Sequence, residues 1–440
     1  MAGFDRRTFL GASIGGLSGL ATVAPMFGKE GDSDKKKVET KPATPTPPKP
    51  VSIKMDKESF ETLFLTWQRD PTTTMTVQWI GPDVHDTEIK YATLDKDAAW
   101  QLQATLARPY PFTNLLVFRA ELTNLKPGTE YQFRIGNREK KYRFRTMPAK
   151  ATDAFHFVSG GDCGTNDHAI ANNIMAARQN PMFALIGGDL GYDDGRKPDI
   201  SVGFMRNYSQ HMIDHQRRLI PMVVCIGNHE VNGGYGKTRK EAPFYFALHD
   251  GLYSERSYAT LDFGDYLSLV LLDTGHVAKI DGEQTAWLDK TLAERAERPH
   301  LIVANHVPAY PSFRKVESTG ATLGTGQLNR THWSPLFEKH LVDAVLEHHD
   351  HTFKRTHTLK DGHVDKNGVM YLGDGSWGRL RPPSPPEARP YLATVSQSYH
   401  LTLHRLEGEQ RFHMAMEEGG RIVDVCMTGK RLRRPVGRGA

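Results

Sequence analysis

Four short turns that carry carboxylate, amide or imidazole side chains each follow an apolar run in this chain. The runs are residues 155–159, 182–186, 222–226 and 301–304, and the turns that follow them hold Asp162, Asp189, Asn228-His229 and Asn305-His306. Apolar runs of this length are typical of buried strands, and open α/β folds place their ligands beyond the carboxyl ends of the strands. We therefore expect these oxygen and nitrogen donors to meet at the mouth of a parallel sheet.

A further group of imidazoles stands at residues 348–351, which read His-His-Asp-His. His349 and His351, two positions apart, project to the same side if the chain there is extended. Taken singly, an Asp at a strand-to-helix turn is usually an N-cap, and a lone His is usually a satisfied core or surface group. Taken together, the donors are hard to explain in this way and indicate a metal site. The set is Asp162, Asp189, Asn228, His306, His349 and His351.

The donor types restrict the metal. Mixed carboxylate, amide and imidazole ligands suit borderline first-row metals better than thiolate zinc or all-oxygen calcium. The donors are also too many for one ion with an open position, so two ions that share a bridging ligand are implied. Paired ions that clamp the attacking and leaving oxygens are a standard device for phosphate ester hydrolysis.

The ordered motifs closely resemble the five motifs of the purple acid phosphatases, within the calcineurin-like metallophosphoesterases. They are Gly161-Asp162-Cys163-Gly164, Gly188-Asp189-Leu190-Gly191-Tyr192, Gly227-Asn228-His229-Glu230, Val303-Ala304-Asn305-His306 and His349-Asp350-His351. The resemblance extends from about residue 55 to residue 428. It implies an Fe(III) site of Asp162, Asp189, Tyr192 and His351. It also implies a second site for a divalent ion (Fe, Zn or Mn), formed by Asp189, Asn228, His306 and His349, with Asp189 as the bridge.

Tyr192 makes the resemblance more specific. Many relatives in the wider superfamily begin with Asp-x-His, whereas Gly164 stands at that histidine position here. Tyr192 can supply the missing ligand, because a trivalent ion overcomes the high pKa of a phenol, about 10 in model compounds. The alternative is that Tyr192 only packs against the sheet.

The resemblance implies hydrolysis of phosphate monoesters by attack of a metal-bound hydroxide. His229 is the candidate for binding the transferring phosphoryl group or protonating the leaving oxygen, and its structural alternative is to hold the Asn228 loop. One rival is a phosphodiesterase, or a nucleotide or phospholipid-headgroup hydrolase, with the same site. A more remote rival is a non-catalytic surface-binding protein.

The chain departs from the family pattern around the substrate pocket. His348 replaces the glycine that usually precedes the last motif, and it could fill a surface turn or crowd the site. Residues 307–314 lack the histidines that plant-type members carry there. Tyr310, Arg314 and His276 are the alternative candidates for binding substrate.

The sequence around these residues predicts that the chain has five segments. They are a twin-arginine export signal (1–28), a charged Pro-rich linker (29–50), a fibronectin type III-like domain (51–148), a metallophosphoesterase domain (149–428) and a basic tail (429–440). The second of the two folded domains alternates strands with helices, which is typical of a mainly parallel sheet. The fold class is therefore α/β, with an all-β sandwich preceding an α/β/β/α sandwich.

Within the sandwich, Leu125, Pro127 and Tyr131 have the spacing of a tyrosine corner, and Trp67 and Trp79 are expected in the core. In the second domain we expect helices at 168–178, 204–215, 284–293 and 336–346. Strand character is expected at 244–246, 257–263, 267–273 and 369–372. A long loop is expected at 308–331, and two or three antiparallel strands between 399 and 427.

Composition and targeting signals bound the remaining properties. The chain has 440 residues, 20 His and a modest formal charge of +5, which gives no argument for nucleic acid binding. Three scattered cysteines predict free thiols; Cys163, next to Asp162, could touch metal or substrate. Arg6-Arg7 before a short Gly-rich apolar stretch predicts export by the twin-arginine route to the periplasm, cell surface or medium. The expected partners are a small-molecule phosphate ester and, transiently, the export machinery; the oligomeric state stays open.

Overall fold

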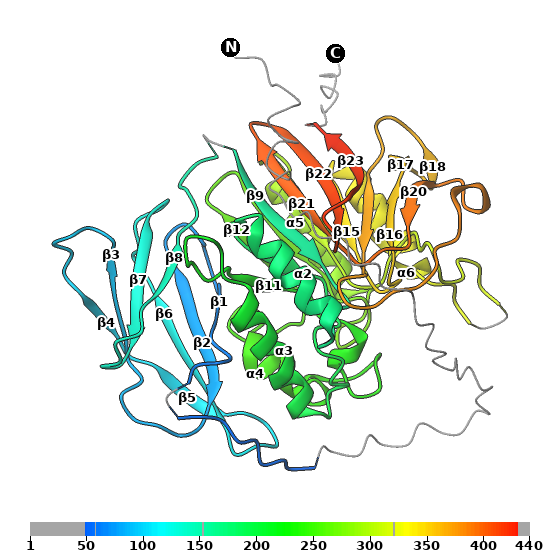
Figure 1. Ribbon diagram of the computed structural model, residues 1–440. Coiled ribbons are helices and arrows are strands. Elements are labelled where there is room, and N and C mark those ends of the chain that lie inside the picture. Colours follow the sequence, from blue (N-terminus) through cyan, green and yellow to red (C-terminus); the bar gives the residue numbers. More distant parts are fainter. Residues whose placement is uncertain (1–48, 58, 152–153, 320–321, 430–440) are drawn as a thin grey trace, which may run out of the picture. The chain divides into compact units, whose positions relative to one another are not determined.

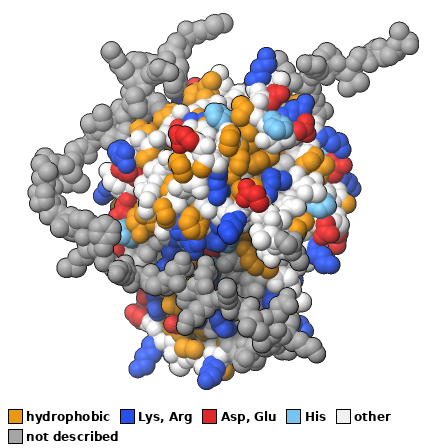
Figure 2. All heavy atoms as spheres, turned by 90° about the vertical axis from the view of Figure 1, so that its right-hand side faces the viewer, with side chains coloured by type: hydrophobic (Ala, Val, Ile, Leu, Met, Phe, Trp, Pro, Cys, Tyr) orange, Lys and Arg blue, Asp and Glu red, His pale blue; other side chains and the backbone are white. Residues whose placement is uncertain are grey.

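The computed structural model describes residues 49–57, 59–151, 154–319 and 322–429. The expected export signal, almost all of the linker and residues 430–440 of the tail lie outside the described residues. Among the described helices, none has the length and apolarity needed to cross a membrane. Figure 2 shows one face of the molecule, on which basic, acidic and apolar side chains are interspersed.

The first folded part is a β-sandwich of two antiparallel four-stranded sheets. One sheet has the order β1-β2-β6-β5, with β1 (Phe64–Thr66), β2 (Met75–Gly81), β5 (Leu106–Pro109) and β6 (Leu116–Leu122). The other has the order β4-β3-β7-β8, with β3 (Ile89–Thr93), β4 (Gln101–Gln103), β7 (Glu130–Ile135) and β8 (Tyr142–Arg145). Trp67 and Trp79 are each 1% exposed, so both belong to the core as expected.

The predicted tyrosine corner is present at the start of β7. The hydroxyl of Tyr131 accepts the backbone N–H of Lys126 at 2.8 Å, and Leu125 is buried beside it. This bond ties the turn that enters β7 to the strand itself, which fixes the crossing between the two sheets.

The second folded part contains a six-stranded mixed sheet with the order β11-β10-β9-β21-β22-β23. Its parallel strands β9, β10 and β11 come first in the chain, and β21 runs antiparallel to β9. The bounds are β9 (Phe155–Gly160), β10 (Ala184–Ile186), β11 (Met222–Val224), β21 (His400–Glu407), β22 (Gln410–Glu417) and β23 (Ile422–Thr428). The last three are the antiparallel strands expected near the C-terminus.

A seven-stranded sheet has the order β12-β13-β14-β15-β19-β16-β20. Strands β13, β14, β15 and β19 are parallel, and β12, β16 and β20 pair antiparallel. The bounds are β12 (Ala259–Phe263), β13 (Leu267–Leu271), β14 (His300–Ala304), β15 (Ala344–Glu347), β16 (Phe353–Thr356), β19 (Tyr371–Asp374) and β20 (Leu392–Ser396). A separate small hairpin, β17 (Leu359–Lys360) and β18 (His363–Val364), lies between β16 and β19 in the chain.

Helices cover both sheets, which completes the α/β/β/α arrangement. Helices α2 (Asp167–Arg178) and α3 (Pro198–His211) lie side by side over the sheet that contains β9, with α4 (Pro243–His249) nearby (Figure 1). Helices α5 (Glu283–Arg295), α6 (Gln327–His332) and α7 (Ser334–Lys339) belong with the other sheet, whose core cluster includes Leu288, Trp333 and Phe337. The described residues also contain the single 3-10 turns η2 (Asn228–Glu230), η3 (Arg239–Glu241) and η4 (Pro386–Ala388).

Some sequence-based assignments of elements were wrong. Residues 244–246 form part of helix α4, which begins at Pro243, rather than a strand. The expected helix 336–346 is split between the end of α7 and strand β15. The expected loop 308–331 already contains most of α6, and α3 begins and ends earlier than 204–215.

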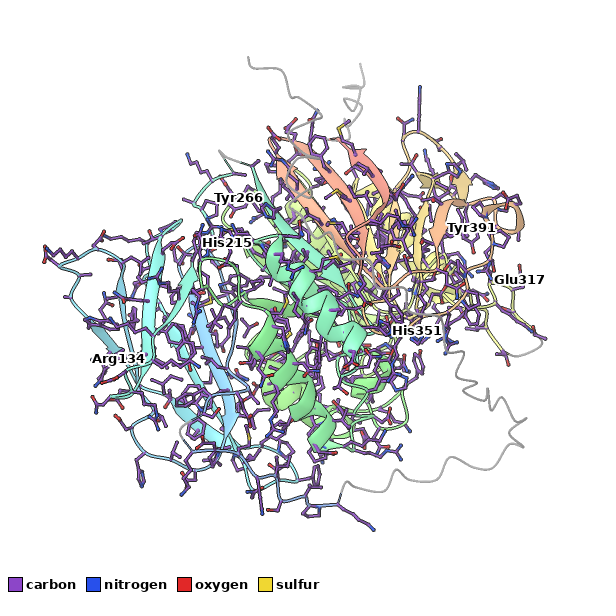
Figure 3. The ribbon with its side chains drawn as sticks, viewed as in Figure 1. Arg134, His215, Tyr266, Glu317, His351 and Tyr391 are labelled. Atoms are coloured by element: carbon purple, nitrogen blue, oxygen red, sulfur yellow. The ribbon has the colours of Figure 1, made fainter. Side chains whose placement is uncertain are left out.

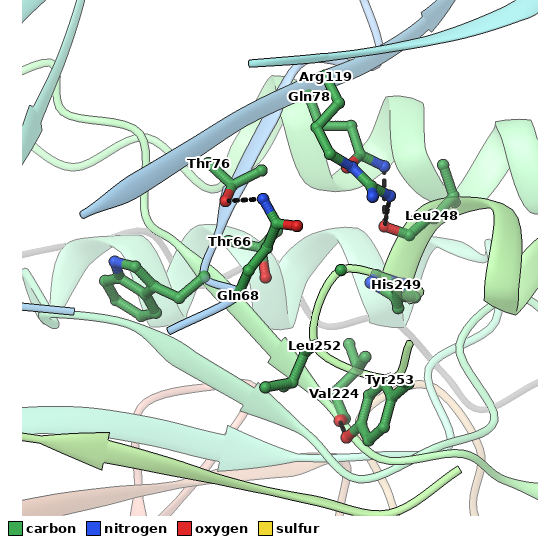
Figure 4. A pocket seen from close by; sticks show the side chains of 12 residues that line it. Thr66, Gln68, Thr76, Gln78, Arg119, Val224, Leu248, His249, Leu252 and Tyr253 are labelled. Atoms are coloured by element: carbon green, nitrogen blue, oxygen red, sulfur yellow. Dashed lines mark hydrogen bonds between the residues drawn. The ribbon is translucent and has the colours of Figure 1, made fainter. Parts of the chain in front are cut away.

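The sandwich is docked on the second folded part through both apolar and polar contacts. The Trp67 ring lies 6.0 Å from that of Phe183 and 5.8 Å from that of Phe263. Gln78 and Arg119 each donate to the carbonyl of Leu248, at 2.8 and 3.2 Å, beside a small pocket (Figure 4). Because Trp67 packs on Phe183 and Phe263 of the second folded part, the two parts share apolar contacts.

Candidate metal centre

The predicted donors converge where the two sheets meet. Asp162, Asp189 and Asn228 follow β9, β10 and β11 of the six-stranded sheet, whereas His306 and the pair His349 and His351 follow β14 and β15 of the seven-stranded sheet. Figure 3 shows His351 among closely packed side chains near one end of α2. The donors therefore come from the strand ends of two sheets, not from the mouth of a single sheet as the sequence suggested.

One group of donors consists of Asp162, Tyr192 and His351. The Tyr192 hydroxyl donates to Asp162 Oδ1 at 3.3 Å and lies 3.0 Å from His351 Nε2. His351 Nε2 is in turn 3.1 Å from the same Asp162 oxygen. Although Tyr192 also packs on a neighbouring ring, its oxygen therefore points into the donor group. Three atoms of different type thus surround one point.

The other group consists of Asn228, His306 and His349. His306 Nδ1 donates to the Gly187 carbonyl at 2.9 Å, which directs Nε2 toward the other donors. That Nε2 lies 3.1 Å from Asn228 Oδ1 and 3.1 Å from His349 Nδ1. With the proton on Nδ1, the Nε2 lone pair of the neutral His306 ring faces two other atoms that can also act as acceptors. A group of facing lone pairs suits a cation.

Asp189 lies between the two groups. Donor atoms of Asp162, Asp189, His306 and His349 all lie within 4.8 Å of one another, and all four residues are buried. Asp189 Oδ1 accepts the backbone N–H of His229 at 2.8 Å and lies 3.3 Å from His306 Nε2. Its Oδ2 is buried without a hydrogen-bond partner. A buried carboxylate oxygen of this kind is costly unless a cation binds it, so the donor set fits metal ions.

The electrostatics favour positive charge at this point. Burial would lower the pKa of His306, but the carboxylates of Asp189 and Asp162 outweigh it and raise that pKa to about 9. Burial and the same two carboxylates raise the pKa of the Tyr192 phenol well above its usual value. Tyr192 can act as a phenolate only beside a strong cation, which is the demand that a trivalent ion meets.

The backbone at the donors is unusual. Asp162, Asp189, Tyr192, His349 and His351 all have positive φ, between 53° and 73°. Only a few per cent of non-glycine residues adopt this left-handed region, and such residues gather at functional sites. The chain at His349 and His351 is not extended, so the condition for the two side chains to project to the same side is not met. Tight left-handed turns direct one ring to each of the two groups.

Glu230 is a functional residue that the sequence interpretation left without a role. Its carboxylate accepts the backbone N–H groups of Asp189 at 2.8 Å, Leu190 at 2.7 Å and Gly227 at 2.7 Å. It therefore ties the Asp189 turn to the Asn228 turn. The signal was its place in Gly-Asn-His-Glu, where a buried acid directly follows the histidine.

His229 lies at the edge of the donor cluster. Its Nδ1 lies 2.6 Å from Asp194 Oδ1, its Nε2 lies 4.0 Å from Asp189 Oδ2, and its ring is 4.3 Å from that of Tyr192. Burial would lower the pKa of His229, but the hydrogen bond to Asp194 and the nearby acidic groups raise it. The Asp194 carboxylate thus orients the His229 ring and favours its charged form.

His348 does not fill a surface turn, because it is buried. It is 1% exposed, and its Nδ1 lies 2.9 Å from the Asn305 carbonyl. Its ring fills the space beside Gly161 and Gly187, where an added Cβ would collide with the imidazole. The two glycines of the first motifs therefore make room for His348 beneath the site.

The other candidates for substrate binding differ in position. His276 is fully buried, with its ring nitrogens 2.9 Å from Thr274 Oγ1 and 3.0 Å from the Gly234 carbonyl. Tyr310 belongs to the core cluster. Arg314 reaches the site, where it donates to the His349 carbonyl at 3.3 Å. The three cysteines are free as predicted, and the metal-ligating cluster found among the described residues does not include Cys163.

Two family models match the chain. Residues 60–146 match the purple acid phosphatase N-terminal domain, and residues 156–353 match the calcineurin-like phosphoesterases. Purple acid phosphatase 21 of Arabidopsis thaliana is 25% identical over 268 residues, which cover 59% of this chain and 58% of that protein. The Fe(3+)-Zn(2+) purple acid phosphatase 12 of the same plant is 24% identical over 303 residues, 65% of this chain and 62% of that protein.

A solved structure shares the fold. Purple acid phosphatase PPD1 from yellow lupin (Lupinus luteus) seeds aligns with a TM-score of 0.69 and 16% identity over 83% of this chain and 73% of that one. The chain spans little more than half the length of the first relative, 58%.

Proposed function

Because the chain belongs to the purple acid phosphatase family of calcineurin-like phosphoesterases, we propose that it is a dinuclear-metal phosphatase that hydrolyses phosphate monoesters. One observation carries the proposal: the four buried donors whose ligand atoms lie within 4.8 Å of one another, with one Asp189 oxygen lacking any hydrogen-bond partner. Such a cluster is costly in a folded protein unless cations occupy it.

Each residue receives a role from its position. Asp162, Tyr192 and His351 would hold Fe(III), and Asn228, His306 and His349 would hold a divalent Fe, Zn or Mn ion. Asp189 would bridge them, since its carboxylate lies between the two groups. When bound, the ion pair supplies Lewis acidity that activates water and neutralises charge on the phosphate oxygens.

His229 would act on the leaving group. The Asp194 carboxylate holds Nδ1, so the proton on Nε2 is free to point toward the donor cluster, 4.0 Å from Asp189 Oδ2. A protonated ring there stabilises the phosphate anion and donates that proton to the departing alkoxide. The hydrogen bond to Asp194 and the packing against the Tyr192 ring, 4.3 Å away, together keep this ring in one orientation.

The experiment is a visible absorption spectrum of the metal-loaded protein beside Tyr192→Phe, with iron, zinc and manganese quantified and hydrolysis of an aryl phosphate measured. We expect a visible band that Tyr192→Phe removes, and hydrolysis that Asp189→Asn abolishes. A colourless, active enzyme without iron would overturn the Fe(III) site and the role of Tyr192. No hydrolysis of any phosphate ester by fully loaded protein would overturn the phosphatase and support a binding protein.

The preference for monoesters is tested separately. The same preparation is assayed with an aryl phosphate and with the corresponding bis-aryl phosphate at equal concentration. We expect a higher kcat/KM for the monoester, because a dianionic phosphoryl group gains more from two cations than a monoanionic diester does. A preference for the diester would assign the site to phosphodiester hydrolysis.

We also propose that the protein is exported by the twin-arginine route. The support is the sequence Arg6-Arg7-Thr8-Phe9-Leu10 before a short apolar stretch. Cell fractionation of the wild type and of a variant with both Arg6→Lys and Arg7→Lys tests this. Loss of the exported fraction in the variant is the expected result, and unchanged export would contradict it.

A further inference from the structure

Three arginines surround the outer side of the donor cluster, and we call Arg314, Arg379 and Arg381 the basic rim. The Arg379 guanidinium carbon lies 4.2 Å from the centre of the Tyr192 ring. Arg381 Nε donates to His351 Nδ1 at 3.2 Å, and Arg314 donates to the His349 carbonyl at 3.3 Å. Each arginine thus contacts a different residue of the site.

The two loops that carry the basic rim are tied together. Arg389 donates to the carbonyls of Phe313 and Arg314 at 3.1 and 2.8 Å, and also to that of Pro311. The backbone N–H of Ser384 donates to the Ser312 carbonyl at 2.7 Å. These bonds join residues that are about 75 positions apart, so the loops hold their guanidinium groups in place before any ligand binds.

The basic rim carries more positive charge than its neighbours neutralise. Within the described part of the chain, no carboxylate pairs with Arg379 or Arg381, and Arg379 Nε is buried without a hydrogen-bond partner. Arg314 has Asp350 at 3.6 Å, and that carboxylate also accepts the backbone N–H groups of Ser312 and Phe313. Unpaired guanidinium groups in partly buried positions are arranged to receive an anion.

We propose that the basic rim binds a second phosphate group of the substrate. This rests on the proposed function, since two metal ions and His229 already suffice for the phosphoryl group that is cleaved. The surplus charge then selects substrates in which another phosphate lies next to the reacting one, either through an anhydride or on a neighbouring carbon. Guanidinium groups suit phosphate because their planar donors bind two oxygens at once. Tyr235 and Phe313, 46% and 37% exposed, flank the same region.

The test compares substrates on the metal-loaded enzyme. The kcat/KM values are measured for inorganic pyrophosphate, inositol hexakisphosphate and an aryl monophosphate with the wild type, Arg379→Gln and Arg381→Gln. Arg143→Gln, an exposed arginine on strand β8 of the sandwich, is the matched control. Metal content is quantified for every variant, because Arg379 and Arg381 contact proposed ligands.

We expect each rim variant to reduce the ratio of kcat/KM for the second-phosphate substrates to that for the aryl phosphate by about tenfold or more, since a charge-assisted hydrogen bond contributes about that factor. Loss with pyrophosphate alone identifies an anhydride substrate, and loss with the inositol phosphate alone identifies phosphates on neighbouring carbons. An unchanged ratio with both substrates, at normal metal content, overturns the proposal while leaving the phosphatase intact.

A binding measurement separates this inference from the proposed function. Calorimetry measures how tightly the metal-loaded protein binds methylenediphosphonate and how tightly it binds inorganic phosphate. The diphosphonate cannot be hydrolysed at its P–C–P bridge. We expect the diphosphonate to bind more tightly, and Arg379→Gln to remove most of the difference. If the protein hydrolyses nothing but this difference persists, the proposed function fails and the basic rim stands. If both ligands bind equally to the wild type, the basic rim is overturned.

Discussion

His306 Nε2 lies 3.1 Å from His349 Nδ1, so two buried imidazole nitrogens face one another. The Gly187 carbonyl holds the proton of His306 on its opposite nitrogen. Burial, together with the nearby His306, keeps the pKa of His349 well below its usual value. The two imidazoles are therefore stable side by side only when positive charge lies between them and Asp189. The prediction about metal removal depends on this need for positive charge.

Removal of metal should lower thermal stability as well as activity. Ions that bind the folded state alone stabilise it in proportion to the logarithm of their concentration, so we expect treatment with a chelator to lower Tm by about 5 °C or more. Differential scanning calorimetry before chelation, after it and after readdition of iron with zinc or manganese is the measurement. Asp189→Asn should show little further response to the chelator. An equal Tm with and without ions would contradict the fit of the cluster to metal.

Glu230→Gln should loosen both metal-bearing turns. The amide keeps one acceptor oxygen but presents an NH2 group to backbone N–H donors, so we expect about 2–3 kcal/mol of lost stability and a reduced metal content. Urea unfolding and metal analysis measure the two effects. Glu255→Gln, at an exposed position, is the control. A variant that keeps its full metal content would show that the three backbone bonds do not position the donors.

Asp194→Asn should move the pH profile of the reaction. Asp194 stabilises the charged form of His229, and its own pKa falls to about 2: burial opposes this, but the hydrogen bonds to His229 and Lys197 outweigh it. Removing this carboxylate lowers the pKa of His229, so the protonated ring is lost at a lower pH. The alkaline limb of kcat/KM should therefore shift to lower pH. Asp199→Asn, an exposed acid nearby, should leave that limb in place.

The fold should lose stability in mild acid. Burial lowers the pKa of His249 to about 3, and burial with Arg411 lowers that of His300 to about 3. The unfolded chain takes up these protons near pH 6.5 and the folded chain does not, so stability falls as pH drops from 6.5 toward 3. At pH 5 each histidine should cost about 2 kcal/mol relative to pH 7.5. Urea unfolding at both values, with His249→Gln as the variant, tests this; an equal pH dependence in the variant would contradict it.

Lys354→Met should destabilise the strand that leads from the last motif. Lys354 and Glu347 form an ion pair at 2.6 Å, each 1% exposed, and Glu347 also accepts the Ala309 N–H. Leaving one buried charge unpaired costs about 3–5 kcal/mol. The double variant with Glu347→Leu should recover part of the loss, whereas Lys360→Met, on the exposed hairpin, should change little. Equal unfolding in the single and double variants would show that the charges do not interact.

The residues of the candidate site could be predicted because their signals are local. A strand that ends in Gly-Asp or Asn-His is visible within a few residues, and sheet topology then brings such ends together. The tyrosine corner at Tyr131 was predictable for the same reason. The donors' left-handed backbone was not, because non-glycine residues adopt positive φ only when distant contacts hold them there.

Two elements were misassigned for a different reason. Phe244, Tyr245 and Phe246 favour strands by propensity, yet Pro243 starts a helix and all three rings are buried on different sides. Residues 344–347 continue an apolar pattern that a helix or a buried parallel strand could produce equally well. Of the basic rim, the sequence singled out Arg314 alone, because Arg379 and Arg381 come from a loop far from it in the sequence.

The left-handed conformation of five donor residues sets a trade-off for evolution and for engineering. Each such residue costs of order 1–3 kcal/mol, so substitution by glycine at Asp162 or His351 would relieve backbone strain while it removes a donor. Libraries selected for heat resistance in the absence of metal should therefore accumulate inactive survivors at these positions. In the metal-loaded protein the stabilisation that bound ions provide opposes this gain, so the donor side chains exchange backbone strain for metal affinity.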